Sequence, residues 1–175
     1  EGTLRPLGGP SDEELASLAS EAAASVEAGY RSALSAKEYR AAIARLDSLK
    51  ALSEDESLSS FLSPSAAAEA AAWKEKRRAI LIDEAEDFFD KGQSTPALLV
   101  YLSALDNGAA SGSPEELSRW AGRALLARDR RSLGMICGEL SARSLDLPSG
   151  AQDFLASRDS MATMRSGVVT IRVDK

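Results

Sequence analysis

Residues 79–105 constrain the fold more than any other stretch, because they hold two apolar periodic segments separated by a short polar break. Apolar or small side chains recur every three or four positions on either side of the break, which is the spacing of one helix face. They are Leu81, Ala85 and Phe88 before the break, and Ala97, Tyr101, Ala104 and Leu105 after it. Gly92 suits the left-handed conformation that ends a helix, and Pro96 suits the first turn of the next. The stretch predicts two antiparallel helices joined by a tight turn.

The spacing of small and aromatic residues in this helix pair resembles that of a tetratricopeptide (TPR) unit. The matching positions are Ala85, Phe88, Gly92, Ala97, Tyr101 and Ala104. The chain departs from the pattern at Glu84, where the family usually has Leu, and at Asn107, where the closing Pro is absent. The resemblance implies an all-α fold in which antiparallel helical hairpins stack as a short solenoid. It also implies that the first helix of each unit lines a concave surface.

Further helices are predicted on both sides of this pair. Ser11 with Glu14, and Ser113 with Glu116, have the spacing of capping boxes that begin helices. Apolar periodicity predicts helices that include residues 12–36, 37–52, 66–91 and 129–145. Gly29, Gly134 and Gly138 predict close contacts between helices. The expected organisation is an extended leader or linker over 1–10, a TPR-like helical domain over 11–147, a capping helix and linker over 148–166, and a β-strand over 167–175.

The last nine residues have a different period. Val169, Ile171 and Val173 alternate with polar residues, which is typical of a half-buried β-strand. A single strand cannot satisfy its own backbone groups, so it predicts either an unpaired tail or the first strand of a following domain. The phrase SGVVTIRVDK resembles the opening strand of the trypsin-like domain in HtrA/Deg serine proteases. That resemblance implies an extracytoplasmic location, with the family's catalytic residues beyond Lys175.

The rarity of histidine and cysteine limits the chemistry. The chain has no histidine and one cysteine. Ser-His-Asp catalysis, Cys-His catalysis, and zinc sites built from histidines or thiolates therefore cannot be assembled from its own residues. The formal net charge is −6, whereas a nucleic-acid-binding protein usually carries a basic surface, so this class of function is disfavoured. No apolar run approaches the ~20 residues of a membrane span. We expect no cofactor, no nucleic-acid partner and no direct membrane insertion.

The TPR resemblance identifies a candidate peptide-binding groove on the first helices. By position it consists of Ile82, Glu86, Phe89 and Asp90 from the central unit, and of Arg119, Arg123 and Leu126 from the next. Arg119 and Arg123 are four positions apart and share a helix face. An arginine pair that faces the acidic residues Glu86 and Asp90 could bind an extended peptide. A guanidinium can bind a carboxylate of such a peptide with two parallel hydrogen bonds. The alternative is that these are ordinary surface charges. The family's clamp of Lys and Asn is disfavoured, since Asn107 is the only asparagine.

Three other groups have simpler structural interpretations. The carboxylates between residues 83 and 90 suggest cation binding, but helical spacing scatters them around the axis, which favours a solvated face. Cys137 lies in an apolar stripe, which indicates a buried, unreactive thiol rather than a redox site. Trp73 and Trp120 fit a hydrophobic core better than a ligand-stacking site.

These patterns lead to one main functional hypothesis and two alternatives. The main hypothesis is a non-catalytic interaction or scaffolding module, the N-terminal part of a larger protein, that binds a protein or an extended peptide. It includes intramolecular contact with a downstream domain. The first alternative, from the tail, is a regulatory or substrate-recruiting domain of an HtrA-type serine protease. The second is an enzyme that uses carboxylates alone, for which the sequence has no motif.

Overall fold

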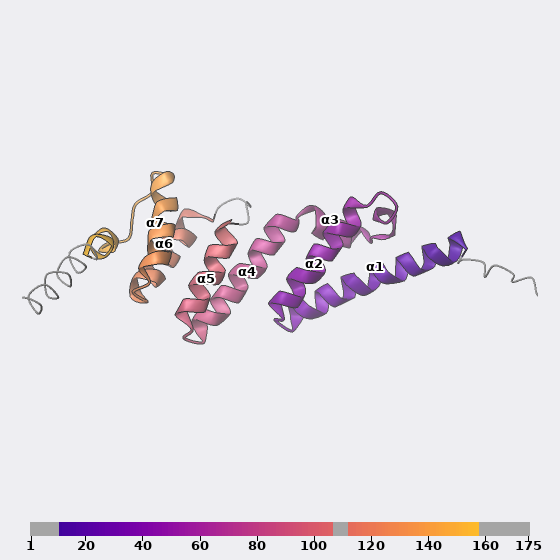
Figure 1. The fold of residues 1–175 in the computed structure, drawn as a ribbon, viewed down its shortest axis with the longest axis horizontal. Helices are drawn as coiled ribbons and strands as arrows, with labels where there is room; N and C mark the ends of the chain where they lie inside the picture. Colours follow the sequence, from indigo (N-terminus) through magenta and orange to yellow (C-terminus); the bar gives the residue numbers. More distant parts are fainter. Residues whose placement is uncertain (1–10, 107–111, 158–175) are drawn as a thin grey trace, which may run out of the picture. The chain divides into compact units, whose positions relative to one another are not determined.

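The computed structural model describes residues 11–106 and 112–157 (Figure 1). Within these residues the regular structure is entirely helical, which confirms the prediction of an all-α chain. The helices are α1 (Asp12–Ser35), α2 (Tyr39–Glu54), the 3-10 helix η1 (Ser59–Phe61), α3 (Pro64–Ala71), α4 (Trp73–Asp90), α5 (Ser94–Asp106), α6 (Pro114–Leu126) and α7 (Arg130–Ala142). Residues 151–157 are also helical.

The chain divides into two compact units, Glu1–Ile80 and Leu81–Lys175. Helix α4 crosses this division, so its first half belongs to unit 1 and its second half to unit 2. The sequence predicts a single helical domain over residues 11–147 and contains no linker at residue 80. The division is therefore a feature of packing that local composition does not reveal.

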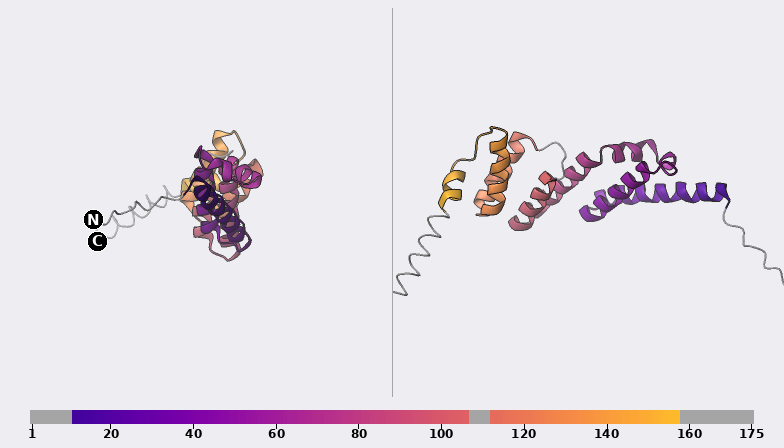
Figure 2. Two further views of the ribbon diagram at one scale, coloured as in Figure 1. Left: turned by 90° about the vertical axis from the view of Figure 1, so that its right-hand side faces the viewer. Right: turned by 45° about the horizontal axis from the view of Figure 1, so that its top comes forward.

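In unit 1, α1 and α2 form an antiparallel pair, and α3 packs on α2 (Figure 2). Helix α1 begins with the predicted capping box, in which Ser11 and Glu14 each accept a backbone hydrogen bond from the other. The core of the pair is built from small and aliphatic side chains of α2, with Leu46 and Leu49 fully buried. The N-terminal half of α1 leaves Leu15 and Leu18 exposed. Only the C-terminal half of α1 therefore contributes strongly to this core.

Polar side chains also connect the helices of unit 1. Glu27 of α1 forms an ion pair with Arg31 at 2.5 Å and accepts a hydrogen bond from Ser63 Oγ at 2.7 Å. The buried Tyr30 donates from its hydroxyl to Glu69 of α3 at 3.4 Å. Burial, together with the charge of Glu69, raises the pKa of Tyr30 to about 12. The junction between α1 and α3 is therefore a polar one.

The predicted continuous helix over residues 66–91 is wrong, because the helix breaks at Ala72. This residue has φ −92° and ψ 25°, and it separates α3 from α4. The break contains no glycine or proline, so the local sequence does not explain it. The next residue, Trp73, donates from Nε1 to Asp47 Oδ1 of α2 at 2.6 Å, and the ammonium of Lys50 lies 5.3 Å from its ring centroid. A tertiary contact thus fixes the chain where the helix changes direction.

Unit 2 contains the helix pair that residues 79–105 predict. Helix α4 ends in a Schellman turn, in which the N–H of Gly92 donates to Phe89 O and the N–H of Gln93 donates to Phe88 O, both at 2.9 Å. Gly92 has φ 73°, the left-handed conformation expected at this position. The three alanines proposed for the helix contact, Ala85, Ala97 and Ala104, are at most 1% exposed. The small residues at these positions are therefore enclosed in the core of unit 2, as expected for closely packed helices.

Helices α6 and α7 complete unit 2 and pack on each other and on α5. The predicted close packing at Gly138 is wrong, because a side chain added there would meet nothing within 4 Å. A Cβ added at Gly134 would lie 3.8 Å from Cδ2 of Leu155, an ordinary van der Waals contact, so this glycine faces the helical residues 151–157. Arg130 of α7 also holds this segment by donating to Leu155 O at 2.8 Å.

Several sequence predictions fall outside the described residues. They are the leader over residues 1–10, the second half of the predicted capping segment, and the β-strand over 167–175. Among the helices that the structure does describe, none combines the length and the apolar character needed to cross a bilayer.

Candidate functional site

The predicted groove residues lie on the second half of α4 and on α6, both within unit 2. On α4, Ile82, Glu86 and Phe89 follow the spacing i, i+4, i+7, which places them on one helix face. Arg119, Arg123 and Leu126 repeat the same spacing on α6. We call these six residues together with Asp90 the α4–α6 surface.

An ion-pair network centred on Glu86 joins the two helices. Arg119 Nη2 lies 2.9 Å from Glu86 Oε1, and Arg123 Nη1 lies 2.6 Å from Glu86 Oε2. Glu86 Oε1 and Arg123 Nη1 are buried and lack the alignment of a hydrogen bond, so the attraction is mainly one of opposite charges at short distance. Both arginines of the predicted peptide clamp therefore have a carboxylate partner inside the chain.

The two arginines differ in exposure and in surroundings. The side chain of Arg123 is 17% exposed, and its guanidinium carbon lies 4.2 Å from the ring centroid of Phe89 and 4.4 Å from that of Trp120. These are cation–π contacts that fix the side chain in one place. The side chain of Arg119 is 54% exposed. Arg123 thus belongs to the framework of the surface, and Arg119 is the cation that solvent and a ligand can reach.

Aromatic side chains support this surface from below. Trp120 is fully buried, stacks on Tyr101 with ring centroids 4.4 Å apart, and meets Phe89 edge-on at 6.1 Å. The Tyr101 hydroxyl donates to Glu116 Oε1 at 3.1 Å. The prediction that Trp120 belongs to the core is confirmed. Three helices of unit 2 therefore hold the ion-pair network on a rigid aromatic base.

The remaining predicted residues lie at the edges of the surface. Leu126 is 83% exposed, Asp90 is exposed, and Ile82 is half-buried. An apolar side chain as exposed as Leu126 is costly to leave in water and is available for contact with another molecule. The structure thus brings Glu86, Phe89, Arg119 and Arg123 into one cluster, while Ile82, Asp90 and Leu126 border it.

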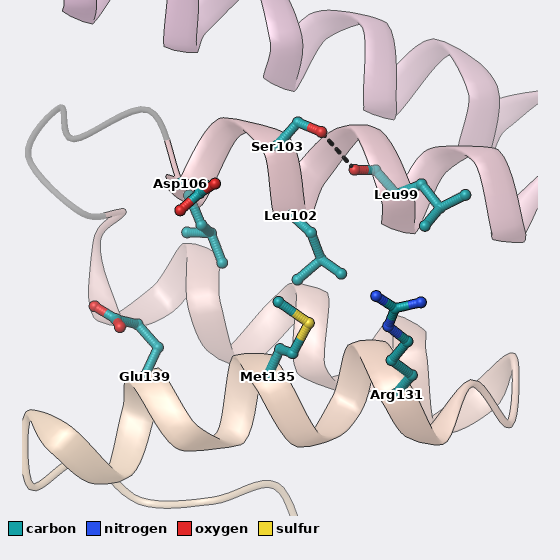
Figure 3. A pocket seen from close by; sticks show the side chains of 8 residues that line it. Leu99, Leu102, Ser103, Asp106, Arg131, Met135 and Glu139 are labelled. Atoms are coloured by element: carbon teal, nitrogen blue, oxygen red, sulfur yellow. Dashed lines mark hydrogen bonds between the residues drawn. The ribbon is translucent and has the colours of Figure 1, made fainter.

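Sequence reasoning missed a second feature, a groove of about 420 Å³ between α5 and α7 (Figure 3). Leu99 and Leu102 line it from α5 and Met135 lines it from α7, and Leu99 and Met135 are each 53% exposed. The signal was present in the sequence, because Leu99 and Met135 are apolar residues on faces that the helical period assigns to solvent. The TPR resemblance implies a binding surface on the first helix of each unit, so it gives no expectation for a groove between α5 and α7.

The other candidates have structural explanations. Cys137 is 4% exposed, and burial raises the pKa of its thiol, which makes it a poor nucleophile. Trp73 is half-buried against α2 rather than enclosed in a core. Within residues 11–106 and 112–157, no three histidine, cysteine, aspartate or glutamate side chains are grouped as a metal site would require.

No protein-family model, curated protein or solved structure matches the chain. The geometry of the chain itself is therefore the guide to what it can do. That geometry offers a fixed cluster of charges and rings on two adjacent helices, α4 and α6.

Proposed function

We propose that this chain is a non-catalytic interaction module that holds another polypeptide on the α4–α6 surface. The observation that carries the proposal is the pairing of Glu86 with both Arg119 and Arg123, which makes one continuous surface from two helices. The proposal includes the stacking of helical hairpins in the TPR manner, with α4 and α6 as the first helices of successive units. The sequence match of the α4–α5 pair supports this part of it.

The chemistry of the surface favours a peptide that carries a carboxylate next to apolar side chains. Arg119 is more than half exposed and can bind a carboxylate with two hydrogen bonds. Leu126 and the half-buried Phe89 provide apolar contacts beside it. An incoming carboxylate must compete with Glu86, so binding replaces one ion pair by another. We expect moderate affinity and ready exchange for this reason.

A selection experiment tests the proposal. Random peptides with free carboxyl termini are selected in parallel against the wild-type chain, the Arg119→Glu variant and the Arg128→Glu variant. Arg128 is an exposed arginine just beyond α6, so its variant carries the same charge change outside the α4–α6 surface.

The wild type and Arg128→Glu should enrich the same peptides, and Arg119→Glu should bind them about tenfold more weakly. Fluorescence anisotropy with the most enriched peptide gives the affinities, and circular dichroism verifies equal helicity. Equal binding by all three proteins, or no enrichment by the wild type, would remove the α4–α6 surface as the binding site.

A further inference from the structure

The groove between α5 and α7 is separate from the α4–α6 surface and has a distinct charge pattern. Its centre is apolar, with Leu102 opposite Met135 and Leu99 beside them (Figure 3). Arg131 lies at one end, whereas Asp106 and Glu139 lie at the other (Figure 3). We call these six residues the α5–α7 groove. It is therefore an apolar strip with a cation at one end and carboxylates at the other.

The charges at the two ends have little compensation among the residues that the structure describes. Within the described residues, Arg131 and Asp106 form no ion pair, while Glu139 is paired with Arg143 at 2.7 Å. Arg131 is the second residue of α7, where the helix dipole disfavours a cation, and Asp106 is the last residue of α5, where the dipole disfavours an anion. Each charge thus interacts unfavourably with the dipole of its own helix. A partner that brings the opposite charge close to it would offset this unfavourable interaction.

The exposed apolar residues of the strip point to the same conclusion. Leu99 and Met135 are both 53% exposed and lie on opposite sides of the groove, one from each helix. Covering such side chains removes apolar area from water at about 25 cal/mol per Å². A partner must therefore present apolar side chains in the centre and charges at both ends in the reverse order.

We propose that the partner is a second copy of this chain, bound groove to groove about a two-fold axis through the centre of the α5–α7 groove. A two-fold axis turns one copy end for end, so Arg131 of each copy faces Asp106 of the other, and the apolar strips meet in the middle. The pattern is self-complementary because its two ends have opposite signs. A chain with like charges at both ends would repel its own copy in this arrangement.

The test uses two variants of the full chain, Arg131→Asp and Asp106→Arg. Each removes a charge that opposes its helix and introduces one that the helix dipole favours. Neither variant is expected to lower the stability of the monomer, so loss of association cannot be attributed to unfolding. Mass is measured by light scattering after size exclusion and by analytical ultracentrifugation over a wide range of concentration.

The wild type should have twice the 18.5 kDa mass of one chain at high concentration, and less association as salt rises. Each variant alone should dissociate about tenfold more readily, because both of its end contacts become repulsive. An equimolar mixture of the two variants should associate as the wild type does. In the mixed dimer the two substituted ends meet with opposite charges, and the two unchanged ends pair as they do in the wild type.

Three results would overturn the proposal. If the wild-type chain is monomeric at every concentration, it does not associate with a second copy of itself. A dimer that both variants leave intact uses another surface. Two variants that are each monomeric and stay so when mixed show that the end charges do not pair between copies. Because the α5–α7 groove shares no residue with the α4–α6 surface, any of these results leaves the peptide-binding proposal standing.

Discussion

In the part of the chain that the structure describes, both units are built from helices, but their tryptophans have opposite roles. In unit 2 the ring of Trp120 is fully buried, and Tyr101 stacks on it. In unit 1 the ring of Trp73 is half-buried at the edge of α2, where its N–H binds Asp47. A buried ring stabilises through the apolar area it removes from water, whereas an edge ring stabilises through hydrogen bonds and cation–π contacts. The comparison shows that residue type alone does not decide how a helix pair is held together.

The tryptophans give the largest expected difference between the units. Trp120→Ala should lower the free energy of unfolding of unit 2 by about 3–5 kcal/mol, because it removes a fully buried ring and its partners. Trp73→Ala should cost unit 1 about 1–2 kcal/mol, through one lost hydrogen bond and the cation–π contacts. Hydrogen exchange of α6 and α2 amides measures each unit separately. Equal costs, or a larger cost at Trp73, would contradict the comparison.

Alkaline pH should distinguish the units through Tyr30. Its pKa is raised to about 12 in the folded chain, against ~10 in the unfolded chain. The folded state therefore binds the phenolic proton more tightly than the unfolded state does. The stability that this contributes is complete below pH ~10 and is lost as pH rises through about 12. Urea unfolding at pH 8 and pH 11 should show a loss for unit 1 that Tyr30→Phe reduces. If Tyr30→Phe has the same pH dependence as the wild type, the polar junction with Glu69 is not the cause.

Two helix glycines give the smallest effect. Gly138→Ala should stabilise unit 2 by about 0.5–1 kcal/mol, because the site is helical and open to solvent. At Gly29 of unit 1 an added Cβ would lie 3.3 Å from Arg45 Nε, so Gly29→Ala should gain less or nothing. Thermal unfolding of the two variants checks the order. A larger gain at Gly29 would show that Arg45 does not pack on α1 as the structure has it.

Local sequence signals predicted the features that depend on short-range geometry. The capping box at Ser11 and the glycine turn at Gly92 have the expected conformations, because caps and turns are determined by residues within a few positions. The break at Ala72 has no such local signal, since it coincides with the contact of Trp73 on α2. The division of the chain within α4 is a result of tertiary packing in the same way.

The candidate site was predicted in part for similar reasons. Helical spacing placed Arg119 and Arg123 on one face, and the TPR resemblance placed that face opposite an acidic helix. Neither showed that one residue, Glu86, pairs with both arginines. The length and rotamers of side chains decide that contact. The amphipathic pattern does not predict the α5–α7 groove, because its apolar residues Leu99 and Met135 lie on the faces that the pattern assigns to solvent.

The most direct test of the central claim is the affinity of Glu86→Gln for a peptide selected on the wild-type chain. If a ligand carboxylate competes with Glu86 for Arg119, removal of the Glu86 charge should strengthen binding roughly three- to tenfold, with unchanged helicity. Isothermal titration calorimetry gives both affinities under one set of conditions. An affinity that stays the same or falls would contradict the claim that the α4–α6 surface binds polypeptide through its arginines.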